Sequence, residues 1–340
     1  IGRGGPPDHM GKKRKPLGGS WGGSADHRAK QRDHETVRLA NLALDALPVD
    51  GPRLRKLAAV RGLVTTETRA RSWPRLLGLP AVEALPPGYS ESSRQEHRDT
   101  STVHCDVLRS MWSFTPGWSD GERDVARAAL QRLLTAVVVA HPGSVHYYQG
   151  LHDVASVLLL VAGEARAYRM LERLALHHLK DCTKPDLQPV MESLRLLLPL
   201  LGAVDEELCA FIEDAGVQPF FALSWLMTWF AHDVDNLADA CRLFDLFLAC
   251  SPLMPLYVGV ASMVDQRERI MAVEPDHGMV HQALSRLKIL GGALSADELA
   301  QRAVALHREH PPDALEAAAG VDLDPGSAAK SFPFEWQEEA

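Results

Sequence analysis

A carboxylate and a guanidinium stand three residues apart in the segment STVHCDVLRSMWSF, residues 101–114. The pair is Asp106 and Arg109. On a helix this spacing puts both side chains on one face, where the carboxylate can hold the guanidinium in place. The same spacing also fits an ordinary exposed ion pair, worth about 0.3 kcal/mol. Taken alone, the segment leaves both interpretations open.

A glutamine stands at the entrance of a helical pattern in HYYQGLHDVASVLLL, residues 146–160. The preceding Pro142-Gly143 ends the helix before it, so we expect Gln149 at the start of the next helix, with its side chain directed toward solvent or a partner. Gly150 permits a close approach of the backbone, and Asp153 can cap or brace the first turn. A polar loop with packed tyrosines would give the same pattern.

Together, the two segments could serve phosphoryl transfer. A fixed arginine can neutralise charge on a phosphoryl group during its transfer. A glutamine can orient an attacking water because its amide both donates and accepts hydrogen bonds. These are the groups that a GTPase with slow intrinsic hydrolysis lacks. A protein that supplies them in trans needs no cofactor of its own, because the GTPase holds the GTP and the Mg²⁺.

The charge distribution argues against nucleic-acid binding. Of the formal net charge of −8, residues 1–38 carry +5, from nine Lys and Arg against four acids, so the rest carries −13. An acidic folded part lacks the positive face of nucleic-acid binders. The sequence also contains no GxSxG, P-loop or GxGxxG motif. A hydrolase nucleophile and a glycine-rich phosphate loop are therefore unsupported.

Fifteen histidines raise the question of a metal site. The dipeptides His152-Asp153 and His232-Asp233 resemble the pattern of HD-type metal phosphohydrolases, which is an alternative function. Two such dipeptides are weak evidence in a chain so rich in His and Asp. The five cysteines form no CxxC pair and fall mainly in apolar helical patterns, which predicts buried, reduced thiols.

Helical periodicity covers nearly all of the sequence between two polar ends. Strand alternation bounded by turn residues is hard to find, and no internal repeat is visible. This pattern predicts an all-α domain of a dozen or more helices with no significant sheet. The expected helices cover residues 36–47, 53–61, 65–78, 101–113, 124–140, 150–162, 165–180, 186–200, 204–214, 219–231, 236–250, 254–271, 278–290 and 295–309.

The two ends of the sequence differ from this helical body. Residues 1–33 mix Gly, Pro and Ser with a KKRK cluster and have little to bury, which predicts a disordered basic tail. Residues 311–340 are expected to form a weakly ordered tail, whose final SFPFEWQEEA could dock on the body through its aromatics. No secretory signal opens the chain, and the long uncharged runs at 215–231 and 246–264 predict buried core helices rather than membrane spans.

Three motifs, in order, resemble those of the TBC domain family of Rab GTPase-activating proteins. RARSWPRLLG, which contains Arg69 and Trp73, is similar to the family's RxxxWxxLLG. VHCDVLRS is similar to IxxDxxR, and YYQGLHD is similar to YxQGxxD. The resemblance covers residues 55–290, and three motifs at fitting separations are more specific than any one of them.

The stretch from 220 to 257 resembles especially the branch of TBC family member 20, whose members are usually tethered to endoplasmic reticulum membranes by a C-terminal span. Some residues depart from the family pattern: Phe244-Asp245 stands where many members have Trp-Asp, and Tyr148 and His152 replace commoner residues. The resemblance implies a cytoplasmic protein, held at endoplasmic reticulum or Golgi membranes where a C-terminal anchor is present. This chain shows no such span, so we expect no direct membrane insertion.

The resemblance implies a two-lobed helical TBC domain over residues 34–310, with an N lobe at 34–180 and a C lobe at 181–310. It also implies that the protein accelerates GTP hydrolysis by a Rab GTPase in vesicle trafficking, with Arg109 as an arginine finger and Gln149 as a glutamine finger. A non-catalytic Rab-binding scaffold of the same fold is the alternative. The residues implied to support the fingers are Asp106, Tyr147, Gly150, Asp153, Arg69 and Trp73.

Overall fold

The described part of the chain is helical. A computed structural model describes residues 22–81 and 84–332, and no β-strand occurs among them. The prediction of an all-α protein is therefore confirmed. The described residues divide into two units, one that ends at Glu35 and one that begins at Thr36.

Helix α1 (Gly22–Asp45) begins within the segment that was expected to be disordered. Residues 1–21 of that segment, including the KKRK cluster, lie outside the described residues. Over residues 22–33 the expectation is corrected. The run ADHRAKQRDHE contains several good helix formers and neither Pro nor Gly, so it can continue the helix that follows it.

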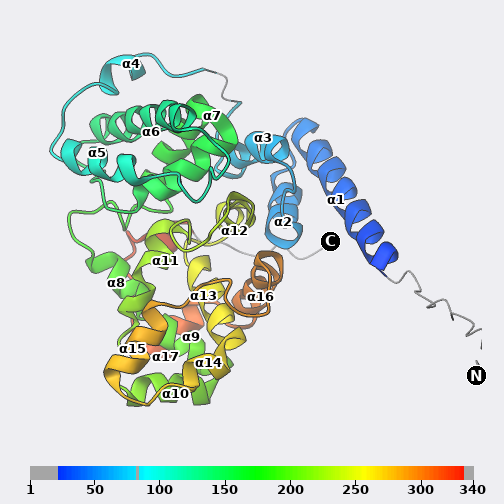
Figure 1. Cartoon of the computed structure of the whole chain (residues 1–340), viewed down its shortest axis with the longest axis vertical. Coiled ribbons are helices and arrows are strands. Elements are labelled where there is room, and N and C mark those ends of the chain that lie inside the picture. Colours follow the sequence, from blue (N-terminus) through cyan, green and yellow to red (C-terminus); the bar gives the residue numbers. More distant parts are fainter. Residues whose placement is uncertain (1–21, 82–83, 333–340) are drawn as a thin grey trace, which may run out of the picture. The chain divides into compact units, whose positions relative to one another are not determined.

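Figure 1 shows the helices that follow, which form two groups along the chain. The first group comprises α2 (Gly51–Arg61), α3 (Thr66–Leu76), α4 (Tyr89–Ser92), α5 (Thr100–Arg109), α6 (Asp120–Ala140) and α7 (Leu151–Leu176). The second group comprises α8 (Gln188–Leu194), α9 (Leu197–Val204), α10 (Glu206–Asp214), the 3₁₀ helix η1 (Pro219–Ala222), α11 (Leu223–Thr228), α12 (Leu237–Ala249), α13 (Met254–Asp265), α14 (Arg267–Met271), α15 (His277–Ser285), α16 (Ala296–Glu309), α17 (Pro312–Ala319) and α18 (Ala328–Ser331).

Helix α12 connects the two groups. It packs on α2, α3 and α7 from the first group and on α13 and α16 from the second. Helix α7 also packs on α3, α5 and α6. The division into lobes near residue 180 stays a prediction.

Helix boundaries follow local sequence signals. Helix α6 begins with a capping box, in which the Ser119 side chain accepts from the Glu122 N–H and the Glu122 side chain accepts from the Ser119 N–H. The two helices expected at 150–162 and 165–180 form the single element α7, with a kink at Gly163 (φ 75°, ψ 166°). Glycine adopts this left-handed conformation without steric cost, so the chain bends there.

The C-terminal segment is more ordered than expected, and the weakly ordered tail is corrected for residues 311–332. Helices α17 and α18 lie in this segment. The Ala328 N–H donates to the buried Asp181 carboxylate at 2.9 Å, and the Phe332 ring lies 4.4 Å from the His177 ring. These contacts attach the segment to the end of α7. The residues beyond Phe332, which include two more aromatics, lie outside the described residues.

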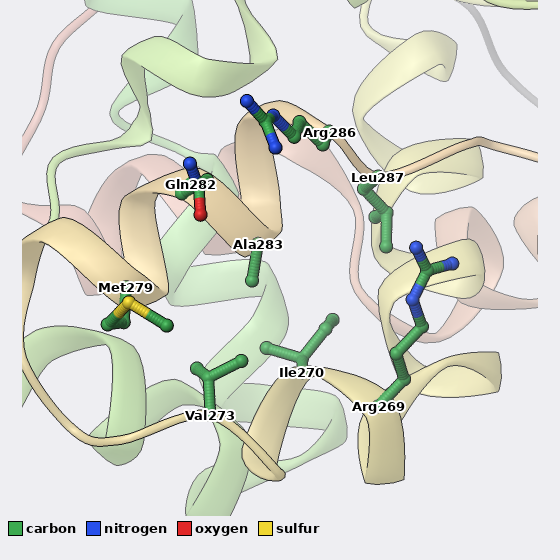
Figure 2. A pocket seen from close by; sticks show the side chains of 8 residues that line it. All are labelled: Arg269, Ile270, Val273, Met279, Gln282, Ala283, Arg286 and Leu287. Carbon is green, nitrogen blue, oxygen red and sulfur yellow. The ribbon is translucent and has the colours of Figure 1, made fainter.

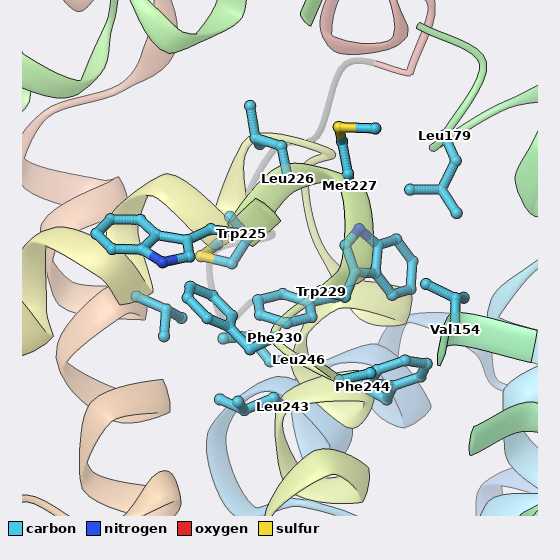
Figure 3. Packing of buried hydrophobic residues seen from close by; sticks show 14 of the residues in the cluster. Val154, Leu179, Trp225, Leu226, Met227, Trp229, Phe230, Leu243, Phe244 and Leu246 are labelled. Atoms are coloured by element: carbon cyan, nitrogen blue, oxygen red, sulfur yellow. The ribbon is translucent and has the colours of Figure 1, made fainter. Parts of the chain in front are cut away.

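A cluster of buried aromatic rings surrounds α12 (Figure 3). The Trp229 ring lies 5.4 Å from that of Phe244 and 5.5 Å from that of Phe247. Trp229 and Phe230 directly follow α11 and both have a left-handed backbone, with φ of 52° and 60°. Such a backbone costs about 1–2 kcal/mol per residue, and burial of a large apolar side chain contributes about 1.5–3 kcal/mol. Packing of the two rings therefore holds a sharp turn after α11.

The long uncharged runs at 215–231 and 246–264 contribute many residues to the core, as predicted. Among residues 22–81 and 84–332, no helix combines the length and the apolarity needed to cross a membrane. All five cysteines are free, and four of them are buried, whereas Cys105 is exposed.

A buried carboxylate ties α3 to α12. Asp245 is 0% exposed, and its oxygens accept from the Trp73 indole N–H at 2.7 Å and from the Arg69 guanidinium at 3.0 Å. The Leu63 N–H donates to the same carboxylate at 2.8 Å. Donors from three residues therefore satisfy one buried charge, which is the condition under which a buried ion pair is tolerated.

We expect Asp245→Asn to lower the free energy of unfolding by about 3–5 kcal/mol, because the buried Arg69 guanidinium loses its counter-charge. Chemical denaturation measures this quantity. Asp235→Asn is the matched control, because Asp235 is 86% exposed and its pair with Lys288 should be worth less than about 1 kcal/mol. Equal losses in the two variants would show that the Asp245 contacts do not hold the fold.

Candidate functional site

Helix α5 ends at Arg109, and its end is fixed by several contacts. The Ser110 hydroxyl donates to the Asp106 carbonyl at 2.8 Å, and the Arg127 guanidinium donates to the Ser110 carbonyl at 3.1 Å. Met111 then leaves the helix with a φ of 73°. A cation in the last turn of a helix also interacts favourably with the exposed carbonyls there. The backbone beneath Arg109 is therefore rigid.

The Asp106 carboxylate lies between Arg109 and Tyr147. Asp106 is 2% exposed, whereas the Arg109 side chain is 65% exposed. The Arg109 guanidinium donates to Oδ1 of Asp106, and the Tyr147 hydroxyl donates to Oδ2 at 2.8 Å. Burial, and then the bond to Asp106, raise the pKa of Tyr147, so its hydroxyl remains a donor. The predicted pairing of Asp106 with Arg109 is present in the structure.

The loop between α6 and α7 carries Gln149 and is held at three points. The His146 N–H donates to the Thr183 carbonyl at 2.9 Å, and the Tyr147 N–H donates to the Asp99 carboxylate at 3.3 Å. The Tyr148 hydroxyl donates to the Met227 carbonyl at 2.8 Å. Both tyrosines are buried, but Gln149 is exposed and its carboxamide makes no hydrogen bond with the described residues. The predicted outward direction of Gln149 agrees with this exposure.

Gly150 closes the loop and stands as the N-cap of α7. Its φ is +119°, and a Cβ at this position would lie 2.8 Å from Cγ2 of Thr228. The backbone thus packs directly against the end of α11, as the expected close approach requires. Asp153 does not cap α7, because no side chain forms the cap bond; it contacts two histidines instead.

His152 and His232 complete this network, and the sequence did not assign either of them to it. The Asp153 carboxylate lies 3.3 Å from Nε2 of His152 and 3.4 Å from Nδ1 of His232. Burial lowers the pKa of His152, and the contact with Asp153 raises the pKa of His232. Both histidines belong to the two His-Asp dipeptides, which the sequence indicated only as candidate metal ligands.

Metal coordination finds no support at these histidines. Among the described residues, no group of three or more His, Cys, Asp or Glu side chains is arranged to hold a metal ion. Asp233 carries a buried Oδ2 without a hydrogen-bond partner in the described structure, and burial raises its pKa to about 6. The two dipeptides meet through the contacts of Asp153 with His152 and His232, at 3.3 and 3.4 Å.

An open hollow of about 540 Å³ lies beside Gln149. Its lining includes Arg98, Lys184, Asp99, Asp186 and Met227, so that charges of both signs and apolar surface border the glutamine. A second hollow, of about 210 Å³, lies between α14 and α15 (Figure 2). Its lining includes none of the residues that the sequence predicted for the site.

Arg69 and Trp73 belong to a hydrogen-bond network that is separate from the one around Arg109 and Gln149. Both donate to Asp245, and neither bonds with Arg109, with Gln149 or with the residues that contact them. Their helix, α3, packs against α7. Arg69 and Trp73 could therefore support Arg109 and Gln149 only indirectly, through the packing of α3 on α7.

Residues 66–271 match the protein family described as the Rab-GTPase-TBC domain. The chain is 35% identical to TBC1 domain family member 20 of Homo sapiens over 326 residues, which cover 94% of this chain and 79% of that protein. It is 33% identical to GTPase-activating protein gyp10 of Schizosaccharomyces pombe over 229 residues, 66% of this chain and 61% of that protein.

Two solved structures share the fold. The Ypt/Rab-GAP domain of Gyp1p aligns with a TM-score of 0.63 at 14% identity, covering 83% of this chain and 98% of that one. The Chlamydomonas flagellar RabGAP TBC domain aligns with a TM-score of 0.59 at 18% identity, covering 87% and 94%. These alignments support the expected helical architecture.

We expect Gly150→Ala to cost at least about 2 kcal/mol, because it adds backbone strain to a collision with Thr228. Gly216→Ala is the control for strain alone, since its φ is +71° and nothing lies within 4 Å of the added Cβ. Thermal or chemical unfolding measures both. Adding Thr228→Ser to Gly150→Ala removes the methyl and should recover part of the loss; strict additivity of the two changes would rule out the collision.

Proposed function

This chain belongs to the Rab-GTPase-TBC domain family, and we propose that it accelerates GTP hydrolysis by a Rab GTPase, to whose active site it contributes Arg109 and Gln149. The observation that carries this proposal is the shared support of the two residues. Arg109 is held by Asp106, Asp106 accepts from Tyr147, and Tyr147 is two residues from Gln149 in the same anchored loop.

Arg109 is suited to stabilise charge on a transferring phosphoryl group. Only one of its nitrogens bonds within the described residues, so the other donors can face a partner. Its carboxylate partner is buried, and a buried partner restricts the guanidinium more than a solvated one would. A guanidinium presents several donors in a fixed fork, which matches phosphate oxygens.

Gln149 is suited to orient the attacking water. Its carboxamide offers both a donor and an acceptor, and these are unused within the described structure. The Rab partner would supply the GTP and the Mg²⁺, so this chain's own contribution is two positioned polar groups. Positioning and electrostatic stabilisation account for most of the catalysis of phosphoryl transfer.

Arg109→Ala should lower the stimulated rate of GTP hydrolysis by about 10³-fold or more, because an arginine supplied in trans is worth that much. Single-turnover phosphate release from a panel of GTP-loaded Rabs measures the effect. Arg169→Ala is the matched control, since Arg169 is also paired at i,i+3 and its side chain is partly exposed. An Arg109→Ala protein with normal stimulation would defeat the proposal.

Replacement of Gln149 by Ala should reduce the stimulated rate by about 10²-fold, as for loss of a group that positions the reacting water. Gln301→Ala, at an exposed glutamine on α16, is the control. Full activity without Gln149 would mean that the partner's own residues orient the water. Binding of Rab without acceleration by the wild-type chain would favour a scaffold.

A further inference from the structure

The imidazole of His152 contacts the supports of both proposed fingers. Its Nδ1 lies 3.1 Å from the Tyr147 hydroxyl and accepts from the Gly150 N–H at 3.3 Å. Tyr147 bonds with Asp106, which holds Arg109. The Gly150 N–H belongs to the peptide bond that directly follows Gln149. One buried ring therefore joins the segment beneath Arg109 to the backbone beside Gln149.

The contacts select one protonation state of the ring. Because the Gly150 N–H points at Nδ1, this nitrogen must present a lone pair. The proton of a neutral ring is then on Nε2, where the Asp153 carboxylate lies 3.3 Å away and can accept it. The Tyr147 hydroxyl lies between two acceptors, Oδ2 of Asp106 at 2.8 Å and Nδ1 at 3.1 Å. In the neutral Nε2–H tautomer, Nδ1 accepts from the Gly150 N–H, Nε2–H can donate to Asp153, and Nδ1 is the second, more distant acceptor for the single Tyr147 proton.

We propose that His152, as a neutral ring with its proton on Nε2, is a positioning residue that sets Arg109 and Gln149 together for GTP hydrolysis. This inference rests on the proposed function. The ring does not touch the nucleotide; it fixes Tyr147 and the Gly150 peptide in one register. A shift in either would displace one finger relative to the other, and displacements of about 1 Å can cost 10²-fold in rate.

Protonation of His152 would disturb this arrangement. An added proton on Nδ1 would oppose the Gly150 N–H and face Oδ2 of Asp106, 3.6 Å away, in competition with the Tyr147 hydroxyl that donates to this oxygen. The charged groups that face the ring shift the pKa of His152 in both directions. Burial lowers its pKa, the carboxylates of Asp153 and Asp106 raise it, and His232, when protonated, and Arg109 lower it. The net pKa lies below the ordinary value of 6.5, so the neutral ring prevails at neutral pH.

Two substitutions separate positioning from simple packing. His152→Leu fills the space without an acceptor and should lower the single-turnover rate about 10²-fold on the Rab that the wild type stimulates most. His152→Asn puts an amide oxygen near the place of Nδ1, can accept from the Gly150 N–H, and should stay within about fivefold of wild type. His307→Asn, at another buried histidine, controls for loss of stability without loss of rate.

The pH profile gives a readout that a packing role would not move. As the pH falls from about 7.5 to the lowest pH at which both proteins stay folded, the wild-type rate should fall relative to the His152→Asn rate once the pH is below the ordinary histidine value of 6.5, because burial lowers the pKa of His152 and only the wild type gains a proton at this site. The ratio of the two rates on one Rab cancels the pH dependence of the partner. Nitrogen chemical shifts of the His152 ring report its tautomer directly in the wild-type protein.

A folded His152→Leu protein with full activity, a constant ratio of rates across this pH range, or a ring protonated on Nδ1 at neutral pH would each overturn the inference. Arg109→Ala in the same assay separates the two proposals. If that variant is inactive while the His152 variants are normal, only the positioning role fails. If Arg109→Ala is also fully active, the proposed function itself fails.

Discussion

The carboxylate of Asp106 divides its two oxygens between a helix and a loop that lie 41 residues apart in the sequence. One oxygen accepts from Arg109 and the other from Tyr147. Because Asp106 is buried, both bonds act in a medium of low dielectric constant, where they are stronger and where loss of either partner costs more. Arg109 can therefore be exposed at its far end and still hold a defined position. An untethered arginine would lose about 2 kcal/mol of rotamer entropy when a partner ordered it.

Asp245 shows the same chemistry used for a different purpose. It too accepts from a guanidinium and from an aromatic donor, those of Arg69 and Trp73. In that cluster the guanidinium is buried, and each of its three nitrogens donates within the fold, the third to the Val64 carbonyl, so burial shields it from a ligand. At Arg109 the carboxylate is buried and the cation is exposed. The exposure of the cation is what distinguishes a structural ion pair from one that can act on a partner.

Local features of the structure could be predicted from the sequence, and contacts between distant segments could not. Helical periodicity located most helices, the three-residue spacing paired Asp106 with Arg109, and the glycine after Gln149 indicated a close approach. The short helices after residue 311 were missed because their stability comes from contacts with distant segments, α17 with α9 and α18 with the residues that follow α7, and not from their own pattern. The role of Arg69 depends on Asp245, 176 residues away. His152 was seen as half of a metal motif, since nothing in the sequence places it against Tyr147.

The two proposed fingers depend on the fold to different degrees. Arg109 is set by contacts within one turn of α5 and by the α6 arginine that caps it. The Gln149 loop is anchored to the N-cap residue of α5, to Thr183 after α7 and to Met227 in α11. The turn that follows α11 is itself held in a left-handed backbone by the buried rings around α12. Since Met227 and Thr228 immediately precede that turn, loosening of the aromatic core would reach the Gln149 loop first, through Tyr148 and Gly150, and Arg109 only through Tyr147 and Asp106. The position of Gln149 thus depends directly on the packing around α12, whereas that of Arg109 depends first on contacts at the end of α5.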